Sequence, residues 1–393
     1  YLNRWKAQTQ EDKPYLVIVN TSGGGSRSAT WVFQVLKECD LKTKFNSSKH
    51  IAMITGASGG TIGASYYRSL LLERKLKGSI NLKNPTYFNE ISSDLLNKLS
   101  FSASTNDLFL RYKAALGVRS IHANYSYDRA MAFELDLNEK TSNRLGKPLK
   151  YFEQFERKAW IPNLIITPTV VNDGRRILIS SMGLSFLMDE QAPSPSLNRI
   201  QEDVDLNLLL SYQNTSNLLL SSALRMNATF PYVLPMTTLP TSPEIQVMDA
   251  GVRDNFGTKT TILWLQKLEN WIAENTAGVI LLQIRDNKKI MYQEKVKEFS
   301  LFDKFTAPLM NVFSNFPRSQ DYDQNEAFHF MLSKFKFPVH TISLNLREYQ
   351  KNRISLSWHL TLNEKLKIKD AIQRPSNVIA LKKYMRLLNK TTD

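Results

Sequence analysis

Two apolar segments near the start of the chain each run straight into a glycine-rich turn and then into a helical pattern. The first, residues 15–19, leads into Asn20-Thr21-Ser22-Gly23-Gly24-Gly25, and the second, residues 51–55, leads into Gly56-Ala57-Ser58-Gly59-Gly60. A continuous apolar run that stops at glycines is typical of a strand buried on both faces of a parallel sheet. Strand, helix, strand and helix in this order predict a layered α/β fold with right-handed crossovers.

The rest of the chain continues this alternation. The patterns predict strands at residues 164–169, 176–180, 244–248, 278–284 and 339–344, and helices at 30–38, 61–72, 217–226, 258–273, 363–372 and 377–388. Asn172-Asp173-Gly174 predicts a hairpin turn between the first two of these strands. Residues 76–160 are mostly helical in pattern, which predicts an inserted or capping layer. No repeat or low-complexity linker interrupts the chain, so one domain with additions is expected.

The composition of the 393 residues is that of an ordinary globular protein. The single cysteine, Cys39, excludes an intramolecular disulfide, and the five scattered histidines lack zinc-site spacing. No apolar stretch reaches the roughly 18–20 residues of a membrane-spanning helix, so the sequence predicts a soluble domain, cytoplasmic or peripheral to a membrane. Because the chain begins with Tyr1, a fragment or processed product is expected, from a larger and even membrane-anchored protein.

The positive charge of the chain is uneven. Its formal net charge is +15, and residues 331–393 carry 13 Lys and Arg against 4 Asp and Glu, a net +9. A basic surface suits anionic lipid headgroups or nucleic acid, or is simply solvated. No nucleic-acid motif accompanies it, so no nucleic-acid partner is expected, and peripheral attachment of this C-terminal region to anionic membranes is the preferred interpretation.

The sharpest chemical signal is Gly56-Ala57-Ser58-Gly59-Gly60, which fits Gly-x-Ser-x-Gly between a predicted strand and a predicted helix. That is the context of a nucleophile elbow. The chain reverses over one residue, so the flanking positions must be small, and the serine hydroxyl is left exposed at the carboxyl edge of the sheet. The positive end of the following helix favours an anion formed there. Ser58 is therefore a candidate nucleophile.

A second signal follows the first predicted strand, at Ser22-Gly23-Gly24-Gly25-Ser26-Arg27. Three successive glycines let backbone N–H groups point at one spot, as an oxyanion hole requires, and Arg27 adds a positive charge. A nucleotide phosphate loop is the rival interpretation, but neither Gly-x-x-x-x-Gly-Lys-Ser/Thr nor Gly-x-Gly-x-x-Gly is present.

A third signal is Asp249-Ala250-Gly251, an acidic residue at a predicted strand end followed by a small-residue turn. A buried carboxylate there can take the proton of a serine hydroxyl. Taken alone, the same residues favour a surface turn that carries an Asp.

Together the three signals resemble the patatin-like phospholipase family, whose pattern is a glycine-rich loop with a basic residue, Gly-x-Ser-x-Gly and Asp-Gly-Gly/Ala. The similarity extends over roughly residues 14–285, including the segments 162–175 and 221–231. Ser22 and Ser28 stand where the family usually has Asp and Gly, a version closer to the group IV cytosolic phospholipases. Ala250 stands where glycine is commoner.

The resemblance implies a three-layer α/β/α fold with a mainly parallel central sheet. It also implies a Ser58–Asp249 dyad, an oxyanion hole at Gly23, Gly24 and Gly25, and an acyl-serine intermediate, without metal or cofactor. The substrate would be a phospholipid or another acyl ester, and Arg27 would bind its phosphate or steady the loop. The domain division is then a lead-in at 1–13, a catalytic domain at 14–285 and a basic extension at 286–393 packed on it.

Two other functions stay open. An ordinary α/β-hydrolase would use Ser, Asp/Glu and His in that order, and His329, His340 and His359 lie downstream, although none follows a strand in a Gly- or Asp-flanked loop. A lipid-binding protein without turnover would keep the fold alone.

Overall fold

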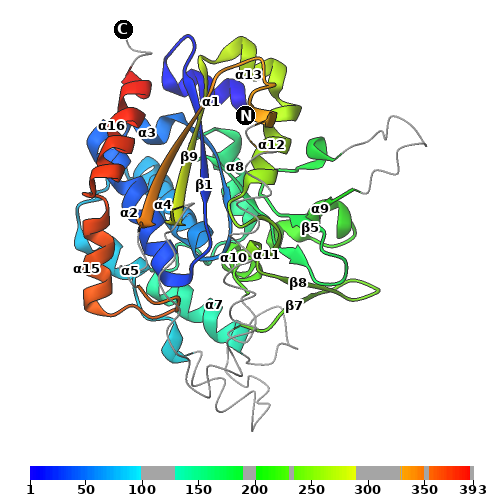
Figure 1. Cartoon of the computed structure of the whole chain (residues 1–393). Helices are drawn as coiled ribbons and strands as arrows, with labels where there is room; N and C mark the ends of the chain where they lie inside the picture. The colour runs from blue at the N-terminus through cyan, green and yellow to red at the C-terminus, as the bar shows by residue number, and fades with distance from the viewer. Residues whose placement is uncertain are drawn as a thin grey trace.

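A five-stranded parallel sheet forms the centre of the molecule. The computed structural model describes residues 1–98, 129–188, 201–229, 234–288, 328, 330–348 and 354–389. The strands stand in the order β10-β9-β1-β2-β3, and every neighbouring pair is parallel (Figure 1). Their bounds are β1 Tyr15–Thr21, β2 Ile51–Gly56, β3 Asn163–Ile166, β9 Gly278–Asn287 and β10 Val339–Arg347.

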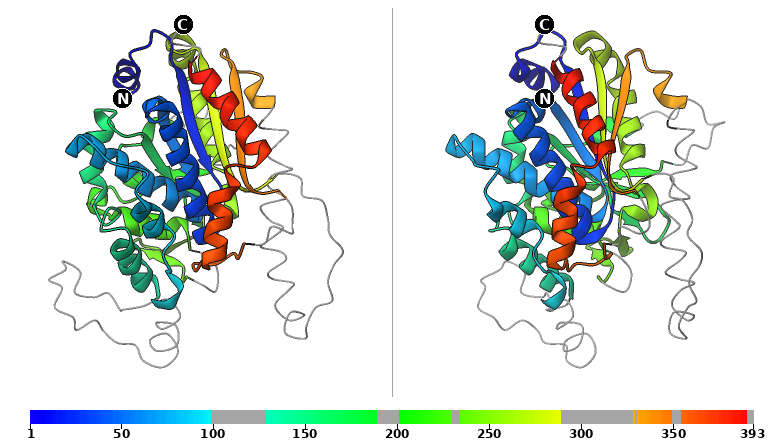
Figure 2. Two further views of the ribbon diagram at one scale, coloured as in Figure 1. Left: turned by 90° about the vertical axis from the view of Figure 1, so that its left-hand side faces the viewer. Right: turned by 60° about the vertical axis from the view of Figure 1, so that its left-hand side comes forward.

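Helices cover both faces of this sheet, which makes three layers (Figure 2). In β1, Val17 and Val19 join one hydrophobic cluster, whereas Leu16 and Ile18 join another, because successive side chains of a strand point to opposite faces. The first cluster is completed by helices α2 Gly25–Thr43, α4 Ser58–Lys77, α15 Leu362–Ala371 and α16 Pro375–Asn389. The second is completed by α1 Leu2–Thr9, α12 Thr258–Lys267 and α13 Glu269–Asn275.

A smaller mixed sheet adjoins the central one. Its order is β6-β5-β4-β8-β7, with β5 and β6 parallel and the other pairs antiparallel. Its strands are β4 Thr169–Val170, β5 Arg176–Leu178, β6 Asp203–Asp205, β7 Thr237–Leu239 and β8 Ile245–Met248. The remaining elements are α3 Asn46–His50, α5 Pro85–Ile91, α7 Arg129–Lys140, α8 Leu149–Arg157, η2 Ser185–Leu187, α9 Leu206–Leu209, η3 Thr215–Asn217, α10 Leu220–Asn227 and α11 Gly251–Asp254.

The α/β/α architecture with a mainly parallel sheet is as predicted, and the differences from the expected elements are local. The strand expected at 164–169 divides into β3 and β4, which belong to different sheets, and the helix expected at 258–273 divides into α12 and α13. The predicted hairpin is present, because β4 and β5 are antiparallel across Asn172-Asp173-Gly174. No second sheet was predicted from the sequence.

Strand register brings the two glycine-rich turns to one edge of the sheet. Thr21, the last residue of β1, is level with Gly56, the last of β2, and with Ile284 near the end of β9. Both turns therefore leave the sheet side by side, at the lower end in Figure 1. The strand β10, which lies within the predicted basic extension, completes the sheet beside β9. No helix in the described part of the chain is long and apolar enough to cross a membrane.

Candidate active site

The turn between β2 and α4 holds Ser58 in an uncommon backbone conformation. Its φ is +51°, in the left-handed region that non-glycine residues rarely occupy. The flanking positions have room only for glycine, because a side chain there would clash with the backbone of β1 and the glycine loop. A Cβ on Gly56, whose φ is +152°, would lie 2.1 Å from the carbonyl oxygen of Thr21, and one on Gly60 would lie 2.3 Å from that of Ser22. Ser58 thus begins a 20-residue helix at a sharp, tightly packed turn, as a nucleophile elbow does.

Asp249 follows β8 of the smaller sheet and is almost completely buried, at 4% exposure. One carboxylate oxygen, Oδ1, accepts the amide of Gly251 at 2.7 Å. The other, Oδ2, is buried and has no hydrogen bond of ordinary length and angle with a described residue. Burial raises the pKa of Asp249 to about 6, and hydrogen bonding from Gly251 and Ser58 offsets part of that rise.

The three predicted motifs meet around the side chain of Asn255. A Cβ on Gly23 would lie 2.8 Å from Asn255 Oδ1 and 3.4 Å from the Cβ of Ser58. A Cβ on Gly251 would lie 2.9 Å from Asp249 Oδ1 and 3.0 Å from the same Asn255 oxygen. The structure therefore brings Ser58, Asp249 and the glycine loop together, although the Ser58–Asp249 contact is looser than a standard hydrogen bond. Such contacts commonly tighten when substrate binds.

The amides of the glycine loop are not equivalent. The N–H of Gly23 donates to Asn255 Oδ1 at 3.1 Å. Those of Gly24 and Gly25 make no hydrogen bond with another described residue. Next along the chain, the N–H of Ser26 donates to the carbonyl of Ser357 at 3.0 Å. Among the described residues, Gly24 and Gly25 therefore differ from Gly23, whose amide is held by Asn255.

Arg27 is buried and engaged with its own protein. Its Nε and one terminal nitrogen donate to the two oxygens of Asp286, both at 2.7 Å, and the other terminal nitrogen donates to the carbonyl of Ile354 at 2.6 Å. Asp286 also accepts from Arg347 at 2.7 Å. Burial would raise the pKa of the Asp286 carboxyl, but Arg27 and then Arg347 outweigh it and hold that pKa below its usual value. This geometry favours a loop-steadying role for Arg27 over contact with a substrate phosphate.

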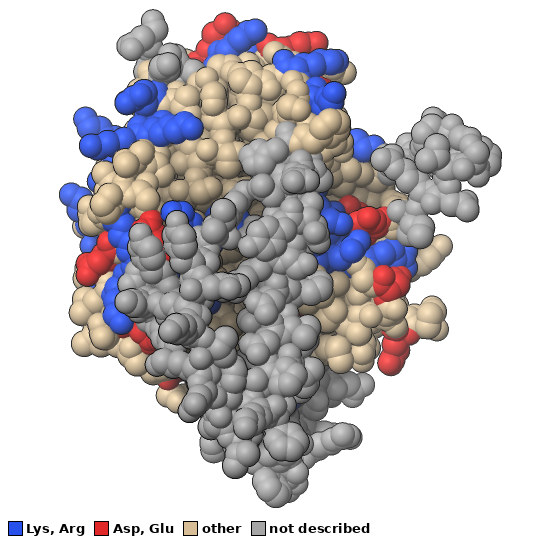
Figure 3. Space-filling view, in the orientation of Figure 1, with Lys and Arg blue, Asp and Glu red and all other residues tan. Residues whose placement is uncertain are grey.

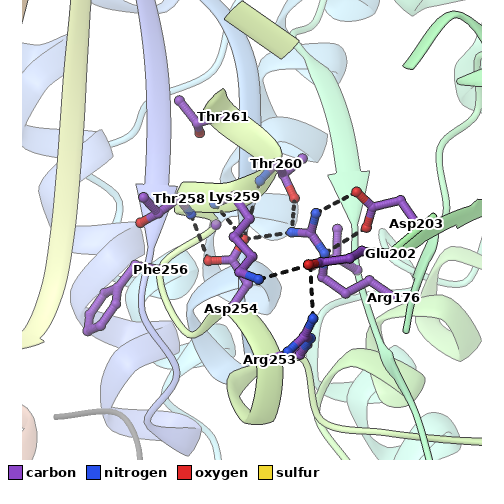
Figure 4. Close-up of polar contacts among 12 residues, drawn as sticks. Arg176, Glu202, Asp203, Arg253, Asp254, Phe256, Thr258, Lys259, Thr260 and Thr261 are labelled. Atoms are coloured by element: carbon purple, nitrogen blue, oxygen red, sulfur yellow. Dashed lines mark hydrogen bonds and ion pairs between the residues drawn. The ribbon is translucent and has the colours of Figure 1, made fainter. Parts of the chain in front are cut away.

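A second buried arginine fixes the turn that follows Asp249 (Figure 4). Arg176 of β5 lies between Asp203, which it binds through two contacts of 2.7 Å, and Asp254, at 2.9 Å. Asp254 in turn caps α12 by accepting the amide of Thr258 at 2.8 Å. The residues just after Asp249 are therefore tied to the smaller sheet on one side and to α12 on the other.

Sequence reasoning gave no role to three residues that hold the motifs in place. Asn227 donates to the carbonyl of Gly56 at 3.2 Å, and its own carbonyl accepts the amide of Ala250 at 3.3 Å, so it joins the two turns. Asn255 binds the glycine loop as described, and the Asp286 amide donates to Ser22 Oγ at 2.7 Å. Their only signal in the sequence is a short polar side chain near a motif or a strand end.

The described histidines are engaged away from Ser58. His50 is bonded to the Tyr15 carbonyl, His340 packs edge-on against the ring of Tyr15, and His359 pairs with Asp94 at 3.0 Å. His122 and His329 lie outside the described residues. Within the described ranges, no group of three or more His, Cys, Asp or Glu side chains could hold a metal ion.

This geometry agrees with a comparison against models of protein families. The model described as "Patatin-like phospholipase" matches residues 21–262. The chain belongs to this family. Membership of the patatin-like phospholipases supports lipid acyl hydrolysis in general, whereas the residues and the kind of lipid require their own evidence. No curated protein sequence matches the chain.

Solved structures similar to this patatin-like chain include human GIVD cytosolic phospholipase A2, with a TM-score of 0.49 and 10% identity over 99% of this chain and 63% of that one. VipD from Legionella pneumophila has a TM-score of 0.37 and 11% identity, over 94% of this chain and 67% of VipD. The type III effector protein ExoU has a TM-score of 0.32 and 13% identity, over 95% and 54%. The chain thus spans between about half and two thirds of the length of these proteins.

Proposed function

We propose that this protein hydrolyses acyl esters of lipids, as a phospholipase A or a lysophospholipase/esterase, with Ser58 as nucleophile and Asp249 as base. One observation carries the proposal. A buried carboxylate oxygen without a standard hydrogen bond lies beside a serine at the start of a long helix, and the pKa of that carboxyl is raised to about 6. A base with a pKa near the working pH both holds the right protonation state and accepts a proton readily.

In the first half of the reaction, Ser58 Oγ attacks the carbonyl carbon of the ester, and Asp249 takes the hydroxyl proton. The carbonyl oxygen becomes an oxyanion facing the amides of Gly24 and Gly25, each such donor stabilising the transition state by about 2.7–4 kcal/mol. Collapse of this intermediate breaks the bond to the alcohol, which leaves with the proton held by Asp249. The product at this stage is an acyl ester of Ser58.

In the second half, Asp249 takes a proton from water as the water oxygen attacks the acyl-serine. The bond to Ser58 Oγ breaks, the free acid leaves, and the proton returns to the Ser58 hydroxyl. A charged base on one side and two amide donors on the other are sufficient for both halves. Arg27 takes no direct part: we assign it to positioning the glycine loop, because its guanidinium is already committed to Asp286 and Ile354.

A fluorophosphonate probe tests the nucleophile. It should label the wild type on Ser58 and leave Ser58→Ala unlabelled, as peptide mapping by mass spectrometry would reveal. Ser69→Ala is the matched control, since Ser69 lies on the same helix with its hydroxyl bonded to the carbonyl of Ser65 at 3.0 Å, and it should be labelled like the wild type. A folded wild-type protein that takes no label, and cleaves neither phospholipid, lysophospholipid nor a soluble ester, would instead be a lipid-binding protein.

The raised pKa of Asp249 predicts the pH dependence of the reaction. Because the base acts as a carboxylate, kcat/KM for a soluble ester should be half-maximal near the pKa of about 6, become level roughly one pH unit above it, and fall about tenfold per pH unit below it. His359→Ala is the control, and its profile should match the wild type. A profile governed by a group that disappears in His359→Ala would point to a histidine base and contradict the dyad.

A further inference from the structure

Three exposed leucines lie near the candidate active site. Leu356, Leu362 and Leu366 have 54%, 77% and 50% of their surface exposed. Leu362 and Leu366 are one turn apart on α15, so they share a face of that helix. A single exposed leucine is ordinary, but neighbouring ones form a surface that is suited to an apolar partner.

The carboxylate of Glu364 holds the base of this group together. It accepts the amide of Ser355 at 2.6 Å and the amide of Thr361 at 2.9 Å. Leu356 and Leu362 each follow one of these residues directly, so both side chains start from the two sides of one carboxylate. The backbones that carry Leu356 and Leu362 therefore lie near each other, and Leu366 lies one turn further along α15; we call these three residues the leucine patch.

The same segment touches the glycine loop. The carbonyl of Ser357 accepts the amide of Ser26, and the carbonyl of Ile354 accepts a bond from Arg27. The leucine patch thus borders the loop that precedes α2. In Figure 1 the start of α15 lies toward the lower end of the molecule, where the parallel strands have their carboxyl ends.

Two lysines lie next to the leucine patch. Lys365 and Lys367 flank Leu366 on α15, whereas the ammonium of Lys369 lies over the ring of Phe88, 4.4 Å from its centroid. Along the edge where Figure 1 places α15 and α16, Lys and Arg side chains are interspersed with Asp and Glu side chains (Figure 3). Exposed leucines with adjacent lysines are what a surface needs in order to sit in the interface of an anionic bilayer.

We propose that the leucine patch, with Lys365 and Lys367, docks the rim of the active site on an anionic lipid bilayer. Insertion of the leucines would bring the glycine loop and Ser58 close to the headgroup layer, so that a lipid can reach the nucleophile without leaving the membrane completely. The inference rests on the proposed function, because it names the surface through which that same site meets its substrate.

Vesicle co-sedimentation of the whole chain tests the leucine patch. With vesicles of phosphatidylcholine and phosphatidylglycerol, Leu362→Ser/Leu366→Ser should lower the partition coefficient at least about tenfold, since each leucine loses its apolar burial. The control Leu76→Ser/Leu208→Ser replaces two leucines of similar exposure elsewhere, at 51% and 55%, and should bind like the wild type. Hydrolysis of a soluble ester should be equal in all of these proteins.

A second pair of variants tests the charges. Lys365→Gln/Lys367→Gln should weaken binding to the anionic vesicles by about fivefold per lysine and leave binding to phosphatidylcholine alone unchanged. Wild-type partition by Leu362→Ser/Leu366→Ser would overturn the inference. So would concentration-dependent self-association in sedimentation velocity that the same substitutions abolish, because it would assign the patch to a second copy of the chain.

Failure of this inference and failure of the proposed function look different. If the leucine patch does not dock on the bilayer, the leucine variants keep vesicle binding while Ser58-dependent ester hydrolysis persists. If the proposed function is wrong, the wild type shows no hydrolysis of any ester, and an apolar patch that still binds vesicles no longer serves an active site.

Discussion

Replacing Asp249 by asparagine is expected to lower kcat for a lipid ester by about three to four decades and, at the same time, to raise the stability of the fold at pH 7. Asparagine has nearly the shape of aspartate, but its amide cannot take the Ser58 proton. Because the loss concerns proton transfer and not substrate binding, it should fall on kcat rather than on KM. Steady-state kinetics on a soluble ester measures both.

The gain in stability follows from the sign of the pKa shift. Burial raises the pKa of Asp249 from 3.8 to about 6. A carboxyl whose pKa is raised on folding stabilises the fold fully when the pH is below its pKa in the unfolded chain. This contribution is lost as the pH rises through its pKa in the folded protein, about 6. Above pH 6 the buried carboxylate therefore disfavours the fold by about 3 kcal/mol, at about 1.4 kcal/mol per pKa unit. Asparagine carries no charge, so Asp249→Asn should melt higher than the wild type at pH 7.

Asp286→Asn is the matched control for Asp249→Asn, because Asp286 is equally buried but has a lowered pKa. A carboxyl whose pKa is lowered on folding stabilises the fold when the pH is above its pKa in the unfolded chain. This contribution is lost as the pH falls through its pKa in the folded protein. At pH 7 this control should therefore melt lower than the wild type, opposite to Asp249→Asn. A stable Asp249→Asn protein with undiminished kcat would place the base elsewhere, and an inactive one that has lost stability would leave misfolding as the cause.

The central sheet and both glycine-rich turns could be predicted because their signals are local. In β1 and β2, runs of five and four successive apolar residues are followed by glycines within a few positions, and nothing distant is needed to recognise that pattern. The smaller sheet gives no such signal. Its strands have two to four residues each, too short to show a period, so only their pairing with β8 and with one another defines them.

Local sequence patterns also do not show where one element ends and the next begins, as between β3 and β4 and between α12 and α13. Residues 164–169 read as one apolar strand, but Ile166 pairs with β2 in the central sheet while Thr169 pairs with Met248 in the smaller one. Tertiary contacts decide where such a run divides, and a local pattern contains none of them.

The three motifs of the candidate site could be predicted from the sequence, but the contacts that hold these motifs together could not. Asn227, Asn255 and Asp286 join segments that are far apart in the sequence, and Gly23 and Asn255 are 232 residues apart. Arg27 shows the consequence most clearly. Its two roles could not be separated from the sequence, because its partner Asp286 lies 259 residues further along the chain.

Arg27→Gln should therefore reduce stability and activity together. Removing the guanidinium leaves the buried carboxylate of Asp286 with Arg347 as its charged partner, so the loss of folding free energy should stay below the ~3–5 kcal/mol that follows when a buried charge loses its partner entirely. It also releases the start of α2 from β9 and from residue 354, so the amides of Gly24 and Gly25 are less well placed. Chemical unfolding measures the first effect and kcat the second.

Arg347→Gln is the control, since Arg347 binds the same carboxylate at 2.7 Å but, among the described residues, donates no hydrogen bond to the glycine loop at residues 22–27. It should lose less stability, because Arg27 still holds Asp286 through two bonds, and it should keep kcat close to that of the wild type. Equal losses of kcat in both variants would mean that the charge of Asp286, and not the tether to the loop, controls the site.

A comparison of two substrates, a phospholipid and a phosphate-free ester, distinguishes the two roles of Arg27. If Arg27 positions the loop, Arg27→Gln lowers kcat for a phospholipid and for a phosphate-free ester by the same factor, because the oxyanion is common to both reactions. If Arg27 instead binds the substrate phosphate, the loss falls on the phospholipid alone, mainly in KM, and the stability of the fold hardly changes. The bidentate pair with Asp286 favours the first result, since a phosphate would have to displace a carboxylate that is already buried and fully paired.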